Sequence, residues 1–528
     1  MNFSTQRILK KPILFLLAVN VLIGLFVFRD YGLSWDEPLF YDYADALGYA
    51  YSPREWFSGN FDLNNSFGSS GDDHKTRGPA YLFLARGPAY LLEAFGLDSA
   101  SAWHLVNFLF FQLGVYFLYR LSRRWMKPGA ALAASALFSW QPLLWGHAFI
   151  NPKDPPFLVF FLGSICLGFE MVDQLFADIK NRQKFISAII PAILLGMTTS
   201  IRVLGPLAAL LVFVYFVIRV MQEKKLRFPA SQWLTFLAYG FIAIVTMFIT
   251  WPYLWENPLA RFFEVFRLMS DNPTTLSVLF GGEIYRAGEL PRRYFPFMLL
   301  TTLTEPVWIL FGVGLVAGYW KLVADPSPEK INKLTTITLT LFWFLFLLAY
   351  VLIRRPSMYD GIRHFLFILP PIFIFAGFTF EYLARLNASF WLRAGAAIVL
   401  LPGLISIIKL HPYEYTYYNS IVGGVSGAFR NYETDYWLTC YKESVEQLEA
   451  LGEPINLFVH REAYIAEYYA DAETSVRELR GALSDVQSGD YVLVNTRTNE
   501  DRRVFKDAPT VLQISRSGAE FCIIKRVP

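Results

Sequence analysis

Two adjacent carboxylates, Asp36 and Glu37, directly follow the first long apolar run of the chain. A carboxylate at a membrane surface can act as a general base that removes a proton from a hydroxyl group. The same residues also fit a capping box, in which Ser34 and Glu37 start a helix through residues 41–47. The two interpretations are compatible, since a cap that fixes the start of the helix would also orient Asp36.

Further ionisable side chains lie in loops near the ends of apolar runs and are candidates for the same site. They are His74, Lys75, Asp154, Arg202, Arg363 and His364. Ionisable groups close to the hydrocarbon are costly, which favours a functional role. Structural alternatives exist: Asp154 could cap the following helix with Pro155 in its first turn, the arginines could be interfacial anchors, and His74–Lys75 could be a solvated pair.

The composition is that of a polytopic membrane protein. Of 528 residues, 54% are hydrophobic and 17% are charged, and the apolar runs are long enough to cross a bilayer. The net charge of +3 is small and spread along the chain, which argues against a nucleic-acid partner. Cys440 and Cys522 could pair if they lie outside the cytoplasm, whereas Cys166 falls in an apolar run. The sequence has no His/Cys spacing typical of a metal site.

Apolar length and the distribution of Lys and Arg predict about eleven transmembrane helices and their direction. The expected spans are 13–28, 103–119, 130–149, 157–172, 185–200, 203–220, 234–250, 297–319, 335–353, 365–382 and 394–410. The basic segment 7–11 would lie inside, so the loop 30–102 would lie outside, and the first span is interpreted as retained rather than as a cleaved signal peptide. The basic cluster 120–127 marks the next cytoplasmic turn.

The segment 185–200 is the weakest of these spans, with 16 residues against the roughly 20 that usually cross a bilayer. If it crosses, Asp36, Asp154, Arg202 and Arg363 all emerge on the outer side. If it does not cross, Arg363 and the C-terminal region move to the cytoplasm, and a single site cannot form.

The sequence becomes mixed and polar after residue 410, which predicts a membrane domain of residues 1–410 and a small α/β domain of residues 411–528 on the extracytoplasmic side. A helix is expected at 441–451. Short strands are expected at 455–459, 491–494 and 511–514. The aromatic run that begins at His411 is interpreted as an interfacial belt and hinge rather than as a sugar-binding platform.

Carboxylates and arginines that meet at a membrane surface suit the transfer of a group from a lipid phosphate. A carboxylate takes the proton of an acceptor hydroxyl, while arginine and lysine hold the departing phosphate. Because a phosphate ester leaves as a stabilised anion, cations can do much of the work without a strong general acid.

The sequence resembles the C-type glycosyltransferases (GT-C fold), in particular the protein O-mannosyltransferases and the lipid A aminoarabinose transferases. The resemblance rests on the acidic pair Asp36–Glu37, on Asp154 within the segment Asn-Pro-Lys-Asp-Pro-Pro-Phe, and on Arg363–His364 at the start of a late span. It covers about the first 410 residues. It implies a polyprenyl-phosphate sugar donor, an inverting displacement and an active site on the extracytoplasmic face.

The resemblance also implies roles for individual residues. Asp36 would deprotonate the acceptor with support from Glu37, and Asp154 would be the second essential acid. Arg202, Arg363, His364 and Lys75 would bind the donor phosphate, and His74 would contact substrate. The family often has a Lys-Pro-Pro segment in the first outer loop, where this chain has the segment 74–79, and this departure leaves the role of Lys75 open.

These inferences predict an inner-membrane enzyme of a bacterium that moves one sugar to a hydroxyl of a glycan, a lipid or a protein. A divalent cation is left open. Three rivals remain: a ligase that transfers oligosaccharides, a transporter or flippase for lipid-linked sugars, and an assembly protein without catalysis. A transporter should show inverted repeats and charges near the middle of the membrane, whereas the charges here gather at one face.

Overall fold

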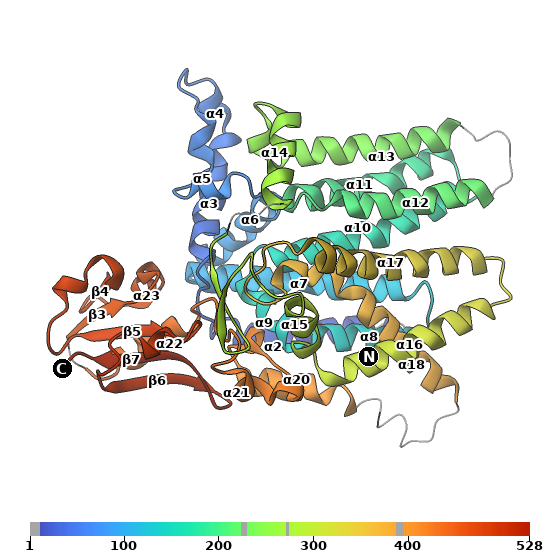
Figure 1. Cartoon of the computed structure of the whole chain (residues 1–528). Coiled ribbons are helices and arrows are strands. Elements are labelled where there is room, and N and C mark those ends of the chain that lie inside the picture. The colour runs from blue at the N-terminus through green and yellow to red at the C-terminus, as the bar shows by residue number, and fades with distance from the viewer. Residues whose placement is uncertain (1–10, 223–229, 271–273, 387–394, 396–397, 453) are drawn as a thin grey trace, which may run out of the picture.

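Long helices that run side by side form most of the molecule, and a small β-sheet lies at one end of them (Figure 1). The computed structural model describes residues 11–222, 230–270, 274–386, 395, 398–452 and 454–528. Several residues used for the predicted topology lie outside this part of the chain: Arg7, Lys10, Lys224, Lys225, Arg227, Arg393 and Ala394.

Six of the described helices are long and apolar enough to cross a membrane, and four shorter helices are also apolar. The long ones are α7 (Ser99–Ser122), α10 (Asp154–Leu175), α11 (Asn181–Ile201), α13 (Ala230–Ile249), α16 (Glu305–Val323) and α17 (Lys330–Arg354). The shorter ones are α2 (Ile13–Val27), α8 (Pro128–Ser139), α12 (Pro206–Gln222) and α20 (Leu401–Leu410). With α18 (Pro370–Arg385) they occupy the predicted spans. The number of eleven crossings stays a prediction.

Two predicted spans differ in detail from the helices observed. The span 130–149 is broken into α8 and α9 (Pro142–Ile150), because a proline begins the second helix. The weak span 185–200 is longer than expected, since α11 begins at Asn181 and continues through Pro191 for 21 residues. At its start the Lys180 N–H donates to Gln183 Oε1 at 3.2 Å. This helix therefore has the length that the one-site topology requires.

Short elements lie across the end of the bundle that carries the sheet, and α3, α4 and α14 run across the direction of the long helices there (Figure 1). Those before α7 are α3 (Glu37–Ala50), α4 (Pro53–Trp56), η1 (Leu63–Ser66), α5 (Gly71–His74) and α6 (Ala80–Ala94). Those after α13 are η2 (Pro252–Leu254), α14 (Pro258–Ser270), the hairpin β1 (Ser277–Phe280) and β2 (Glu283–Arg286), α15 (Tyr294–Thr301) and η3 (Arg363–Ile368).

The C-terminal region contains a five-stranded sheet of order β4-β3-β5-β7-β6. Its strands are β3 (Ile455–Val459), β4 (Thr474–Glu478), β5 (Tyr491–Asn495), β6 (Thr510–Arg516) and β7 (Ala519–Arg526). Strand β3 is parallel to β4 and β5, and β7 is antiparallel to β5 and β6. The helices of this region are η4 (Glu414–Thr416), η5 (Ser420–Val422), α21 (Gly424–Ala428), α22 (Cys440–Glu449), α23 (Ala463–Tyr469), η6 (Leu479–Gly481), η7 (Leu483–Asp485) and η8 (Glu500–Arg502). The helix and the three strands expected from the sequence are confirmed, and β4 and β7 are additional.

A disulfide joins Cys440 at the start of α22 to Cys522 in β7, as the sequence allowed. Cys166 is buried and unpaired. The disulfide fixes the segment before α22 against the centre of the sheet.

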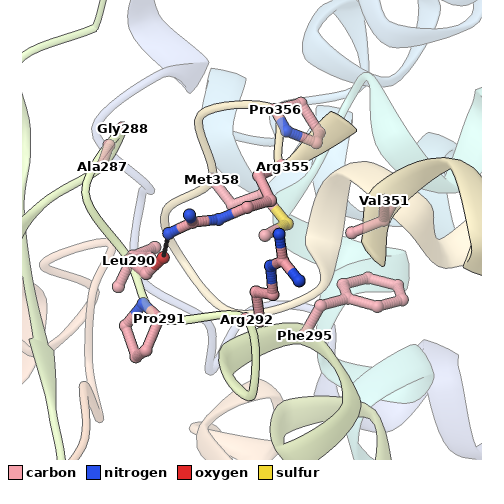
Figure 2. Close-up of a pocket in the computed structure, with 10 residues that line it drawn as sticks. All are labelled: Ala287, Gly288, Leu290, Pro291, Arg292, Phe295, Val351, Arg355, Pro356 and Met358. Atoms are coloured by element: carbon pink, nitrogen blue, oxygen red, sulfur yellow. Dashed lines mark hydrogen bonds between the residues drawn. The ribbon is translucent and has the colours of Figure 1, made fainter. Parts of the chain in front are cut away.

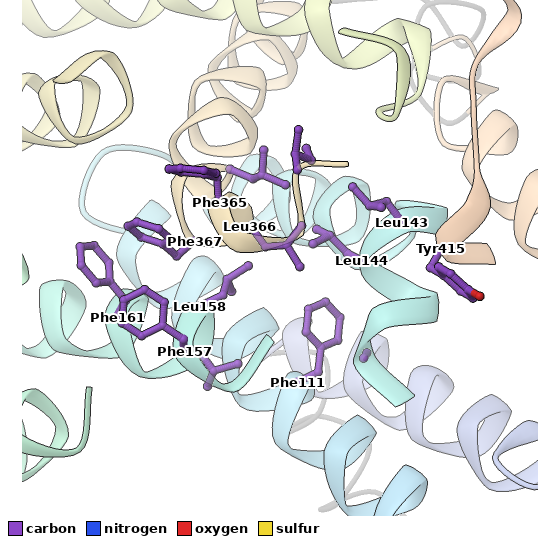
Figure 3. Packing of buried hydrophobic residues seen from close by; sticks show 14 of the residues in the cluster. Phe111, Leu143, Leu144, Phe157, Leu158, Phe161, Phe365, Leu366, Phe367 and Tyr415 are labelled. Carbon is purple, nitrogen blue, oxygen red and sulfur yellow. The ribbon is translucent and has the colours of Figure 1, made fainter. Parts of the chain in front are cut away.

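The aromatic run after α20 lies inside the protein, so its interpretation as an interfacial belt is wrong. Tyr413, Tyr415, Tyr417 and Tyr418 are all buried, and they belong to the same hydrophobic core as the membrane helices. Figure 3 shows Tyr415 beside Leu143 and Leu144 of α9, with aromatic residues of α10 and η3 nearby. The C-terminal region thus packs against the bundle over a shared core.

His411, at the end of α20, connects this region to the first outer turn. Its Nε2 lies 2.9 Å from Asp30 Oδ2, and its Nδ1 lies 2.8 Å from Glu414 Oε1. Burial lowers the pKa of His411, but hydrogen bonds and charge attraction from Glu414, with a smaller contribution from Asp30, outweigh it and raise the pKa above 6.5. The charged imidazole thus stabilises the folded chain.

We expect this contribution to stability to depend on pH. It should be complete below pH 6.5 and be lost as the pH rises through the raised pKa of the folded state. Replacement His411→Gln should therefore lower the apparent Tm of the detergent-solubilised protein by about 2 °C at pH 6 and by less at pH 8.5. A difference that does not change with pH would show that His411 acts through packing alone.

The predicted topology can be tested through Ser488, which is exposed in the turn before β5. The native cysteines are buried or disulfide-bonded, so Ser488→Cys introduces an accessible thiol. We expect a membrane-impermeant maleimide to label it in intact spheroplasts. A matched variant, Glu329→Cys in the turn between α16 and α17, should react only after lysis. Protection of the thiol at position 488 in intact cells would contradict the topology.

Candidate active site

The turn that carries Asp36 is held by main-chain and side-chain contacts on both sides. The Ser34 hydroxyl donates to the carbonyl oxygen of Ile150 at 3.0 Å, and the Ser34 N–H donates to Glu37 Oε2 at 2.7 Å. Only half of the predicted capping box is therefore present. Within the described residues the Asp36 side chain caps no backbone N–H of α3. Its carboxylate is available for other contacts.

Glu37 points away from Asp36 into the protein. Its carboxylate is fully buried and accepts hydrogen bonds from the Ser34 N–H and from the Tyr41 hydroxyl at 2.6 Å. His104 Nε2 lies 3.1 Å from Glu37 Oε1. These partners fix the turn and the start of α3.

Asp154 opens α10, but it does not cap that helix. The cap is Asn151, whose Oδ1 accepts the N–H groups of Lys153 and Asp154 at 3.0 and 2.9 Å. The Asn151 amide also donates to Asp154 Oδ2 at 2.9 Å. Because a neighbouring residue satisfies the helix end, the buried Asp154 carboxylate remains free to bind cations.

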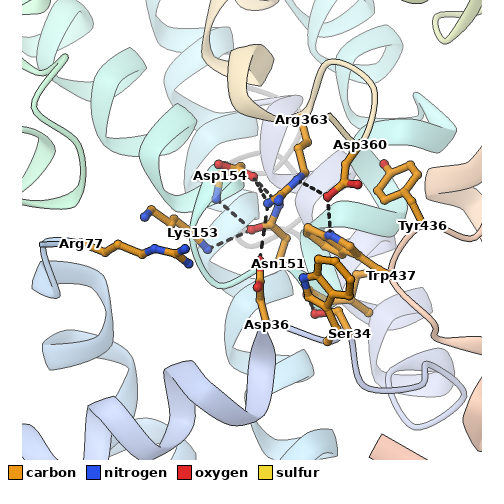
Figure 4. Close-up of polar contacts among 12 residues, drawn as sticks. Ser34, Asp36, Arg77, Asn151, Lys153, Asp154, Asp360, Arg363, Tyr436 and Trp437 are labelled. Atoms are coloured by element: carbon orange, nitrogen blue, oxygen red, sulfur yellow. Dashed lines mark hydrogen bonds and ion pairs between the residues drawn. The ribbon is translucent and has the colours of Figure 1, made fainter. Parts of the chain in front are cut away.

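Two arginines contact these carboxylates, and Figure 4 shows Arg363 beside Asp154. Arg363 Nη1 lies 3.5 Å from Asp154 Oδ2 and 3.6 Å from Asp36 Oδ2. Arg202, directly after α11, forms an ion pair with Asp154 Oδ1. Sequence reasoning predicted all four of these residues, and the structure brings them together at one end of the bundle.

The two carboxylates differ in access. The side chain of Asp36 is 18% exposed, whereas that of Asp154 is 2% exposed and is occupied by two arginines and an amide. A general base must reach the substrate, so Asp36 is the better placed of the two.

The loop before Arg363 is held by the segment that follows β2. Figure 2 shows Arg355 beside Leu290, whose carbonyl oxygen accepts from Arg355 Nη2 at 2.9 Å. The Met358 N–H donates to the Ala287 carbonyl at 3.2 Å, and the Gly361 N–H donates to the Tyr294 hydroxyl at 3.1 Å. The small pocket between these segments measures about 10 Å³. These contacts restrain the loop before it reaches the site.

Three other predicted residues, His74, His364 and Lys75, make the following contacts. His74 is buried edge-on against Phe40, and burial followed by the charge of Arg77 lowers its pKa to about 4. His364 packs edge-on against Tyr359. The Lys75 backbone carbonyl accepts from the Trp251 indole N–H at 3.3 Å.

Two cations that sequence reasoning did not select complete the cluster, Arg77 and Lys153. In Figure 4 they flank the carboxylates on the side away from Asp360. Burial lowers the pKa of Lys153 well below its ordinary value, and the nearby charges of Arg77, Arg202 and Arg363 lower it further. Their positions could have indicated them, because Lys153 adjoins Asp154 and Arg77 lies three residues after His74. Both segments already contained candidate site residues.

Four basic side chains, Arg77, Lys153, Arg202 and Arg363, gather around Asp36 and Asp154, and a third carboxylate, Asp360, pairs with Arg363. Burial first, and then the charges of Arg77, Arg202 and Arg363, lowers the pKa of Lys153. An anion such as a phosphate would relieve the repulsion among these basic groups. For a metal ion, the part of the chain that the structure describes has one group of three potential ligands close together, Asp435 with Cys440 and Cys522, and these two cysteines form the disulfide.

No family model matches this sequence, and no curated protein matches it. The archaeal oligosaccharyltransferase AglB from Archaeoglobus fulgidus, in complex with an inhibitory peptide and a dolichol-phosphate, is similar in structure, with a TM-score of 0.51 and 11% identity over 94% of this chain and 70% of that chain. An oligosaccharyltransferase of the same organism in the apo form also gives 0.51, with 11% identity over 93% and 70%.

ArnT from Cupriavidus metallidurans in the apo state has a TM-score of 0.49 and 12% identity, over 96% of this chain and 97% of that chain. At such identities the likeness to the archaeal enzyme shows the fold. The chain therefore has the C-type glycosyltransferase fold that its sequence resemblance predicts.

Proposed function

We propose that this protein transfers a sugar from a polyprenyl-phosphate donor to a hydroxyl acceptor at the extracytoplasmic membrane surface. The observation that carries the proposal is the meeting of an accessible carboxylate, Asp36, with four basic side chains, Arg77, Lys153, Arg202 and Arg363, at one end of the bundle. A hydroxyl acceptor needs the carboxylate, and a leaving phosphate needs the cations.

The reaction is a single displacement at the anomeric carbon. The Asp36 carboxylate takes the proton of the acceptor hydroxyl as its oxygen forms the new bond to that carbon. The bond between carbon and phosphate oxygen breaks, and the phosphate leaves with the electron pair. Attack opposite to the leaving group inverts the configuration. Arg363 and Lys153 stabilise the charge that develops on the phosphate.

The remaining residues position this machinery. Asp154 holds Arg202 and Arg363 in place through ion pairs. Glu37 fixes the turn that presents Asp36. The donor-binding set becomes Arg77, Lys153, Arg202 and Arg363. His364 and Lys75, assigned to it from the resemblance, are placed here at the edge of the set, and His74 orients Arg77, whose Nη1 lies 3.3 Å from His74 Nε2.

The fold neighbours leave the size of the transferred group open. The archaeal structure holds a dolichol-phosphate and a peptide, which supports a lipid-phosphate donor for this chain. That protein is an oligosaccharyltransferase, so transfer of an oligosaccharide remains the rival within the same chemistry. We keep a glycan, a lipid or a protein as the acceptor classes and the inner membrane of a bacterium as the location.

Replacement Asp36→Asn should abolish transfer and leave donor binding intact. Loss of a positioned general base costs about 10²–10⁴ in rate. The measurement is transfer of radiolabelled sugar from a panel of synthetic polyprenyl phosphate sugars, with cell-envelope extract as acceptor. Asp45→Asn is the matched control, since Asp45 lies on the same helix, is exposed and pairs with Arg86.

The outcomes separate the rival classes. Transfer by wild type and the Asp45 variant, but not by the Asp36 variant, supports catalysis. Wild-type levels of transfer by the Asp36 variant contradict the assignment of the base. If wild type binds every donor and transfers from none, while lipid-linked sugar crosses proteoliposome membranes, the protein is a flippase.

A second expectation concerns Lys153. Replacement Lys153→Met should weaken binding of polyprenyl phosphate by about 10- to 100-fold, because a charge-assisted contact contributes about 1.5–3 kcal/mol. The apo protein should be no less stable, since the replacement removes a buried ammonium group that neighbouring cations repel. Lys409→Met, at the exposed end of α20, is the control and should leave both quantities unchanged. Equal donor affinity in wild type and the Lys153 variant would remove Lys153 from the donor site.

A further inference from the structure

The cationic cluster is continued behind Arg363 by a chain of buried charges that ends in the C-terminal region. Arg363 Nε lies 2.9 Å from Asp360 Oδ2. The other oxygen of Asp360 lies 2.6 Å from Arg497 Nη2, and Arg497 Nε lies 2.9 Å from Glu433 Oε1. The side chains of Asp360, Arg497 and Glu433 are all less than 5% exposed. Arg497 follows β5 at the carboxyl end of the sheet.

Arg497 uses its whole guanidinium fork at this junction. Besides Asp360 and Glu433, it reaches the carbonyl oxygen of Tyr436, which accepts from Nη1 at 3.2 Å. Three acceptors from two separate segments are thus joined by one planar group. A lysine ammonium is a single point of charge on a flexible stem and cannot reproduce this geometry.

The same residue also contacts the turn that presents the proposed base. The guanidinium of Arg497 lies over the ring of Trp35, 5.1 Å from the ring centroid. Trp35 directly precedes Asp36 in the chain. The Tyr464 hydroxyl donates to the Trp35 carbonyl at 2.7 Å, and the Trp35 N–H donates to the Trp437 carbonyl at 3.2 Å. The position of Arg497 therefore bears on both halves of the site, the cation and the carboxylate.

The segment that supports Arg497 is rigid for identifiable reasons. Asn495, the last residue of β5, donates to the Asp435 carbonyl at 3.1 Å and accepts the Arg497 N–H at 2.7 Å. Asn495 pairs in register with Cys522, which is disulfide-bonded to Cys440. The disulfide thus ties the strand next to Arg497 to the segment that supplies its acceptors.

We propose that Arg497 is a positioning residue of the active site, which aligns Arg363 through Asp360 and Asp36 through Trp35, so that the C-terminal region is a working part of the enzyme. This inference rests on the proposed function for its kinetic consequences and on the ion-pair chain alone for its structural ones. Arg497 itself lies behind the reacting groups and does not touch the donor.

The test compares Arg497→Met, Arg497→Lys and the double variant Arg497→Met with Glu433→Gln. The double variant removes one positive and one negative charge, so it restores the charge balance that the single variant breaks. We expect it to recover the Tm of wild type. Its KM for the donor should remain raised by about tenfold, since Asp360 then holds Arg363 without its partner. The KM of Arg497→Lys for the donor should be raised by about as much as that of the double variant.

The control is Arg430→Met. Arg430 is also a tail arginine, paired with Asp501 at 2.6 Å and Glu520 at 3.2 Å, and it makes no recorded contact with Asp360 in the described chain. We expect it to lower the Tm and leave the donor KM unchanged. If the double variant recovers the Tm and the donor KM together, Arg497 serves stability alone and the inference is wrong.

Backbone amide exchange of residues 356–366 tests the inference without any transfer assay. We expect faster exchange of this loop in the double variant than in wild type and the Arg430 variant, and equal exchange would overturn the inference. If wild type transfers from no donor, the proposed function fails while the exchange result still decides the role of Arg497. If wild type transfers and the double variant is unaffected in KM and exchange, only the inference fails.

Discussion

A buried guanidinium charge must be compensated by nearby carboxylates, and three of them lie around Arg363. Asp36 and Asp154 lie on one side of it and Asp360 lies on the other, with distances of 3.6, 3.5 and 2.9 Å. Removing one partner of such a buried pair costs about 3–5 kcal/mol, because it leaves an uncompensated charge. The first outer turn, the start of α10 and the loop before η3 are thereby coupled, although they are far apart in the chain.

This constraint explains why the C-terminal region packs so deeply against the bundle. Asp360 pairs with both Arg363 and Arg497. Arg497 is therefore buried as well, and Glu433 is buried beside it as its second carboxylate partner. Burial first, and then repulsion from Asp360, raises the pKa of Glu433 to about 7, while the charge of Arg497 opposes the shift. The tyrosines after α20 provide the apolar core in which this chain of charges is sealed.

The sequence predicted the residues whose positions follow from topology. Asp36, Asp154, Arg202 and Arg363 each adjoin the end of an apolar run, and counting spans brings all four to one face. The expected direction depended on 185–200, and α11 has the required length because its helix extends to Asn181, among polar residues that an apolar window excludes. Topology says nothing of how a side chain is oriented.

The orientation of individual side chains could not be predicted from the sequence. Glu37 adjoins Asp36 in the chain, and hydrogen bonds from the Tyr41 hydroxyl, one helical turn later, and from the Ser34 N–H hold its carboxylate inside the protein. Asp154 was given a structural alternative as a helix cap, and Asn151 takes that role, as its placement three residues earlier allows. Arg497 could not be selected from the sequence, because it lies in a polar region where an arginine is ordinarily solvated. Only the tertiary fold brings it to Asp360.

The basic side chains of the cluster repel one another in the free protein. Burial first, and then the charges of Arg77, Arg202 and Arg363, lowers the pKa of Lys153. Other contacts must hold these side chains together against the repulsion. We assign this role to Asn151, Asp154 and the ion-pair chain of Asp360, Arg497 and Glu433 behind Arg363. The repulsion is relieved when a phosphate enters, so the same arrangement that costs stability without donor favours its binding and the charge that develops as it leaves.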